Sequence, residues 1–234
     1  ISLSNNDSGG TGGSDSLSAN TFLGYLAGQD IASGGVDNTY FGHKAGSNNA
    51  TGDDNVFIGS NAGKGSHGNS NSNNVGIGSD CMLAVTTGGS NTSIGRDSSK
   101  AITDGHNNVA IGNNALETST SVGYVVAIGD DAMKSGDVTS AADGSIAIGG
   151  SALAALTSGS ANTAIGYQSL DAEDAGDYNT ALGYQTLTAQ DGGESNTAIG
   201  WTAGAAVSTG DKNTIVGSQA GYQFTTGEKN TILG

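Results

Sequence analysis

The stretch Asn-Thr-Ala-Ile-Gly at residues 162–166 recurs, with small variations, from one end of the chain to the other. Its closing glycine occurs thirteen times, and consecutive copies lie 17 residues apart in nine of twelve steps and 18, 19 or 20 apart in the others. These glycines are Gly24, Gly42, Gly59, Gly78, Gly95, Gly112, Gly129, Gly149, Gly166, Gly183, Gly200, Gly217 and Gly234. A period this short matches one turn of a β-solenoid, in which each turn buries its apolar side by stacking on its neighbours.

The residues just before the glycine predict one short strand in every turn. With the glycine counted as position zero, position −1 is large and apolar and position −3 is β-branched in all thirteen copies. Side chains two residues apart on a strand share a face, so we expect these two columns to face the same way, with position −1 as the buried core. Ile165→Asp is then expected to cost several kcal/mol. The isoleucines of this column are Ile58, Ile77, Ile94, Ile111, Ile128, Ile148, Ile165 and Ile199.

Asparagine and glycine mark the corners of the predicted turn. Position −4 is Asn in eleven of thirteen copies, and stacked amides can form a ladder while satisfying backbone groups at a bend. We expect Gly at positions zero and −7 to supply positive φ angles. The asparagine column includes Asn91, Asn108, Asn162, Asn179, Asn196 and Asn213.

The repeat predicts an all-β fold, a parallel β-solenoid (β-roll) of about thirteen 17-residue turns. A helical array would need apolar spacings of three and four over long stretches, and 41 glycines would each cost roughly 1 kcal/mol in helix interiors. Residues 20–234 form the array, and residues 1–19 are an irregular segment or the continuation of a longer chain. The longer steps at residues 64–73 and 135–143 predict small bulges.

Composition and net charge limit the classes of partner that the chain is expected to bind. The net charge of −15 disfavours nucleic acid, and no apolar run of about 18 residues predicts membrane insertion. Each turn has a thin apolar core, so we expect parallel copies to share apolar columns as a fibrous homotrimer. The sequence stops within a copy of the repeat, which favours continuation of the chain or end-to-end stacking.

Phrases such as Val109 to Gly112 and Ile146 to Gly149, each followed three residues on by Ala, resemble the head repeats of trimeric autotransporter adhesins. The stretches Asn162 to Gly166 and Asn196 to Gly200 also resemble repeats of phage tail fibres. The resemblance to adhesin heads implies a left-handed β-roll trimer with an adhesive surface. The resemblance to fibres implies an extracellular virion appendage that contacts a host cell. Neither resemblance brings catalytic residues.

No residue set predicts catalysis, so we expect no enzyme. His43, His67 and His106 stand at different phases of the repeat and predict solvated loop residues, and Cys81 predicts a small buried side chain. Acidic clusters such as Asp130-Asp131 and Asp171 to Asp177 could offer oxygens to Ca²⁺, but solvated charge is favoured, and no metal or other cofactor is predicted.

The position after the glycine offers a candidate ligand site. Tyr167, Tyr184 and Trp201 occupy it in three successive turns, with Gln168 and Gln185 beside the first two. Aromatic faces flanked by amides suit a sugar, although a stack between turns or a subunit contact would use the same residues.

Three functions remain open. The favoured one is an adhesive or receptor-binding fibre segment on a phage or cell surface, binding a host glycan or protein. The alternative is a structural extracellular filament whose subunits stack end to end. An ice-binding solenoid is disfavoured because Val or Ile interrupts the Thr column at position −3 five times.

Overall fold

The computed structural model describes residues 19–31, 35–134 and 142–234. Nearly all of the predicted N-terminal segment and most of the predicted bulge at residues 135–143 lie outside these ranges. The described residues form thirteen three-residue strands, each ending just before a repeat glycine. They are β1 (Thr21–Leu23), β2 (Thr39–Phe41), β3 (Val56–Ile58), β4 (Val75–Ile77), β5 (Thr92–Ile94), β6 (Val109–Ile111), β7 (Val126–Ile128), β8 (Ile146–Ile148), β9 (Thr163–Ile165), β10 (Thr180–Leu182), β11 (Thr197–Ile199), β12 (Thr214–Val216) and β13 (Thr231–Leu233).

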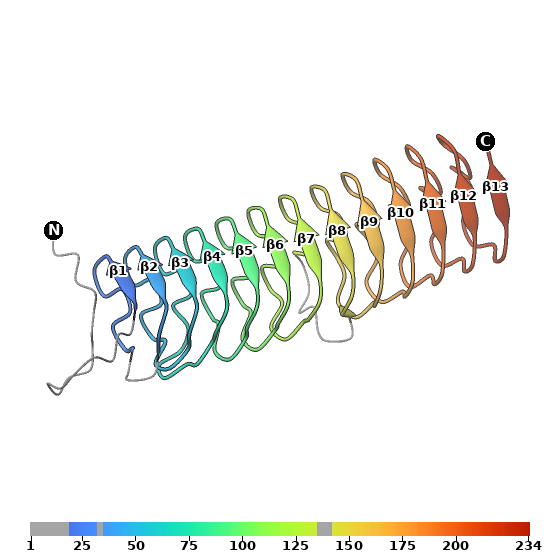
Figure 1. The fold of residues 1–234 in the computed structure, drawn as a ribbon. Coiled ribbons are helices and arrows are strands. Elements are labelled where there is room, and N and C mark those ends of the chain that lie inside the picture. The colour runs from blue at the N-terminus through green and yellow to red at the C-terminus, as the bar shows by residue number, and fades with distance from the viewer. Residues whose placement is uncertain (1–18, 32–34, 135–141) are drawn as a thin grey trace, which may run out of the picture.

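The strands form one parallel sheet in chain order, and Figure 1 shows them side by side along a single rod. Equivalent positions of neighbouring turns pair directly, as Ile111 does with Ile128 and Ile165 with Leu182. The strands are about 4.8 Å apart, so the sheet is about 60 Å long. The prediction of an all-β parallel solenoid with about 17 residues per turn is confirmed.

The position −1 column, which was predicted to be the buried core, lies on the outer face of the sheet, so that prediction is wrong. The middle residue of each strand points inward, as fully buried Ala110, Ala127 and Ala164 show, while positions −3 and −1 lie on the outer face. Ile58, Ile94 and Ile199 are 37%, 36% and 38% exposed. The other isoleucines predicted as core, which are half-buried in the single chain, are Ile77, Ile111, Ile128, Ile148 and Ile165. The interior is too narrow for both apolar columns, and the period of two sends position −2 inward instead.

The side chains at positions −2 and +4 of each turn both point into the interior, and a large residue at one position is matched by a small residue at the other. Tyr40 and Phe57 are matched by Gly46 and Gly63, where an added Cβ would come 2.4 Å and 2.3 Å from the respective ring. Where position −2 is alanine, position +4 is large in five of six turns, as with Ala164 and Leu170. The exception is Ala198 with Gly204, where the side chains of Leu187 and Ile215 from the neighbouring turns approach the glycine. This compensation is the packing expected of a dense core.

The asparagine ladder is confirmed. Asn196 shows the pattern: its backbone N–H and Nδ2 donate to Asn179 Oδ1 at 2.9 and 3.3 Å, and Nδ2 also donates to the carbonyl of Gly210 at 2.7 Å. Ser145, which replaces Asn in one turn, donates to the Gly159 carbonyl and accepts from the backbone of Asn162. The ladder therefore satisfies buried backbone groups at one corner of every such turn.

The two glycine columns serve different purposes. Glycines at position zero have φ angles between 132° and 145°, as predicted. Those at position −7 do not have positive φ, so that prediction is wrong. They are glycine because a Cβ would strike the neighbouring turn: at Gly159 it would lie 2.2 Å from the carbonyl oxygen of Gly176.

Asn179→Ala should lower the free energy of unfolding by about 2 kcal/mol. The change removes the 2.7 Å bond to the Gly193 carbonyl, which keeps only the donor Gln190 Nε2 at 2.9 Å, and it leaves the buried backbone N–H of Asn196 without its acceptor. Urea unfolding followed by circular dichroism measures the loss. Asn113→Ala, which removes only surface hydrogen bonds, is the matched control and should change stability by less than about 0.5 kcal/mol. Equal losses in the two variants would contradict a structural role for the ladder.

Candidate functional site

The outer face of the sheet carries an uncharged surface along all thirteen strands, with large apolar side chains at position −1 and Thr, Val or Ile at position −3. Positions −3 and −1 point outward in register and include no charged residue in any of the thirteen strands. The position −1 column is apolar in all thirteen strands, so an apolar stripe runs along about 60 Å of the rod. The largest apolar patches on soluble proteins often mark binding sites.

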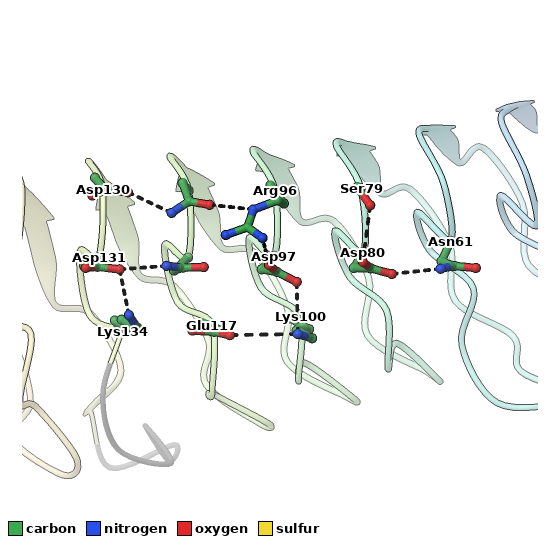
Figure 2. A network of polar contacts seen from close by, with 12 residues as sticks. Asn61, Ser79, Asp80, Arg96, Asp97, Lys100, Glu117, Asp130, Asp131 and Lys134 are labelled. Carbon is green, nitrogen blue, oxygen red and sulfur yellow. Dashed lines mark hydrogen bonds and ion pairs between the residues drawn. The ribbon is translucent and has the colours of Figure 1, made fainter.

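Beside this face, the segment after each glycine forms a ledge made of positions +1, +2 and +5. Between β3 and β8, the ledge is filled by polar side chains that pair along and between turns (Figure 2). Lys100 Nζ lies 3.0 Å from Asp97 Oδ1 and 4.0 Å from Glu117 Oε1, and Lys134 Nζ lies 3.0 Å from Asp131 Oδ1. A lysine at position +5 thus reaches back to the aspartate at position +2.

These pairs shift pKa values in the directions that attraction requires. The hydrogen bond to Asp97 raises the pKa of Lys100, and the hydrogen bond to Asp131 raises that of Lys134. The pKa of Asp131 is lowered, first by the amide of Asn114 and then by Lys134. Both lysines are solvent-exposed, so each pair contributes little to stability and this half of the ledge is a self-satisfied surface.

The predicted aromatic and amide residues come together on the ledge between β9 and β12. Tyr167, Tyr184 and Trp201 are 49%, 47% and 51% exposed, which fits a surface row. The rings of Tyr167 and Tyr184 stack with centroids 5.4 Å apart, so those two rings also form the contact between turns that the sequence left as the alternative. Gln185 Nε2 donates to Gln168 Oε1 at 2.9 Å.

A groove of about 520 Å³, which was not predicted from the sequence, opens next to this row. Gln168, Gln185 and Thr202 line it from position +2, and Asp171, Thr188 and Ala205 line it from position +5. Tyr222 lines it as well. Position +5 is short in the middle of the groove, at Thr188 and Ala205, whereas Lys100 and Lys134 occupy it nearer the N-terminus. Tyr222 stands at the same position at the C-terminal end of the groove.

The acidic cluster at residues 171–177 is not uniformly solvated as predicted. Glu173 is fully buried, and its carboxylate accepts hydrogen bonds from the backbone N–H groups of Gly176 and Gly192 and from Gln190 Nε2. Asp171 lies half-buried in the groove, and desolvation raises its pKa. The sequence interpretation missed both because it assumed that short acidic runs face water.

The remaining chemistry-bearing residues have local partners. His43 stacks on Tyr25, His67 Nδ1 lies 2.6 Å from Asp30 Oδ2, and His106 meets Tyr124 edge-on. The described ranges contain no group of three or more His, Cys, Asp or Glu residues placed to hold a metal ion. Cys81 is buried as predicted, and burial raises the pKa of its thiol to about 12.

No family model, no curated protein and no solved structure matches this chain. Within the part of the chain that the structure describes, no helix has the length and apolar character needed to cross a bilayer.

Proposed function

We propose that this chain is a non-enzymatic, extracellular fibre segment that associates with copies of itself through the outer face of its sheet. On this proposal it presents the aromatic end of its ledge to a host or cell-surface glycan or protein. Its setting is a phage tail fibre or a cell-surface adhesin, in line with the repeats that its own resemble.

The uncharged outer face is the observation that supports self-association. A chain with a net charge of −15 has placed none of its charged side chains on those two columns in thirteen consecutive turns. A rod with an apolar stripe at position −1 fits other copies of itself, because identical strand spacings meet along the sheet. A parallel trimer buries the stripe of every copy around one shared axis.

The exposed aromatic row supports the adhesive part. Tyr167, Tyr184 and Trp201 stand on the ledge rather than on the outer sheet face, so an assembly through that face leaves the row available. Large aromatic side chains provide much of the contact energy in recognition sites. Between β3 and β8 the ledge is occupied by polar side chains that pair with one another.

One feature of the fold favours ice binding as a second candidate function. The threonine column at position −3 faces outward, and it is uninterrupted from β9 to β13. A flat rank of threonines at a fixed spacing is what ice recognition would need. Thermal hysteresis of the purified chain tests this second candidate, and its absence eliminates it.

Replacing Tyr167, Tyr184 and Trp201 together by alanine should reduce binding to target cells to background while the β-sheet circular dichroism stays unchanged. The rings supply the exposed contact area, and none of them belongs to the buried core. Binding of labelled protein to cells, measured by flow cytometry, gives the result.

A control variant removes three aromatic rings that are even more exposed and lie elsewhere on the surface. Tyr25, Tyr124 and Tyr178 are exposed tyrosines outside the row, and their triple alanine variant should keep wild-type binding. Equal binding by both variants and the wild type would show that the row is structural only.

A further inference from the structure

The groove beside the aromatic row has the size of a small-ligand site and is lined by several polar side chains. Its volume of about 520 Å³ is within the range typical of such sites. It extends over the turns that follow β9, β10, β11 and β12, which is a length of about 14 Å along the rod. That length suits a short chain of rings rather than a single small ion.

The amide pair offers both kinds of hydrogen-bonding group. The bond from Gln185 Nε2 to Gln168 Oε1 leaves Gln168 Nε2 as a donor and Gln185 Oε1 as an acceptor. Thr202 adds a hydroxyl near the floor of the groove; the residue is 7% exposed, and its Oγ1 has no hydrogen-bond partner among the described residues. Such a buried group is costly unless a ligand or water pairs with it.

The charge in the groove selects the class of ligand. Asp171 has no salt bridge within the described ranges, whereas Asp97 and Asp131 at the same ledge are paired with lysines. A lone carboxylate repels anions, and one carboxylate is a poor site for a divalent cation, which needs several oxygen ligands. A carboxylate does accept hydrogen bonds strongly from hydroxyl groups.

We propose that the groove lined by Gln168, Asp171, Gln185, Thr188, Thr202 and Tyr222 binds a short neutral oligosaccharide. The amides and Thr202 pair with sugar hydroxyls, Asp171 accepts from two adjacent hydroxyls, and Tyr222 offers an apolar surface to a ring face. This inference rests on the proposed adhesive function and deepens it: it gives the ligand class and adds the groove to the binding surface beside the aromatic row.

Thr188→Lys is the variant that tests the groove. It places a lysine at position +5 in the turn next to Asp171. Lys100 and Glu117 occupy position +5 of adjacent turns in the reverse order, so the variant fills the groove with a kind of pair that the fold already contains. Ser60→Lys adds the same charge at an exposed ledge position far along the rod and serves as the matched control. Asp171→Asn removes the carboxylate and keeps the shape.

The experiment is titration of the full chain and of each variant with neutral hexose and N-acetylhexosamine trisaccharides, measured by calorimetry. We expect wild type and Ser60→Lys to bind one or more of them, and Thr188→Lys and Asp171→Asn to bind at least tenfold more weakly with unchanged thermal midpoints. No binding by the wild type, or undiminished binding by Thr188→Lys, would overturn the proposal.

A cell-binding assay distinguishes failure of the groove proposal from failure of the proposed adhesive function. If Thr188→Lys keeps wild-type cell binding while the aromatic-row variant loses it, the groove proposal is wrong and the adhesive function stands. If the wild-type chain binds no cells while the groove binds trisaccharide, the adhesive function is wrong and the groove site stands.

Discussion

Gly149→Ala should prevent the rod from folding cooperatively, or lower its free energy of unfolding by about 3 kcal/mol or more. The φ angle of Gly149 is 140°, a region that side chains avoid. A Cβ there would lie 2.3 Å from the carbonyl oxygen of Gly166, and that atom is backbone of the adjoining turn and cannot move away alone. Urea unfolding followed by circular dichroism, together with soluble yield, measures the effect.

The neighbouring residue provides the control. Gly150 does not have a positive φ, and a Cβ there would meet the Tyr167 ring at 3.3 Å, which a side chain at the surface can relieve. Gly150→Ala should therefore stay within about 1 kcal/mol of wild type. Similar stability in the two variants would mean that turns are not stacked as closely at the glycine column as described.

The second large effect concerns assembly. The double variant Ile148→Lys with Ile165→Lys should weaken self-association at least about a hundredfold, because each copy would bring two unpaired charges into an apolar contact. Both side chains lie on the outer face, so the single rod should keep its β-sheet circular dichroism. This reverses the sequence-based expectation that an acidic residue at position 165 would break the core.

A variant with two lysines away from the outer face separates charge from position. Ser60→Lys with Tyr178→Lys makes the same change in net charge at exposed sites and should assemble as the wild type does. Sedimentation velocity of both double variants gives the comparison. If both double variants lost assembly, or if neither did, the outer face would not be the contact between copies.

Much of the fold could be predicted because its repeat is directly visible in the sequence. The strand positions, the ladder built on residues such as Asn196, and the corner glycines follow from one column each. Which face of each strand points inward does not follow from the repeat. Ile165 and Ala164 are both apolar, and periodicity alone does not say which of them is buried. The size compensation between Tyr40 and Gly46, or Ala164 and Leu170, was the signal that would have decided it.

The candidate site was only partly predictable. Tyr184, Trp201 and Gln185 were found because they share a phase of the repeat and stand in successive turns. The groove depends on a difference between turns, namely that Thr188 and Ala205 are shorter than Lys100 and Lys134 at the same position. A repeat analysis that looks for what columns share does not detect a hollow made where a column changes.

The mass of the unmodified chain in solution tests the central claim most directly. Light scattering on the purified protein at micromolar concentration should give three chain masses, each of 22.8 kDa, with no further growth as concentration rises. A single-chain mass would contradict burial of the outer sheet face between copies. A mass that grows steadily with concentration would contradict it too, because open-ended growth is the mark of rods stacking end to end.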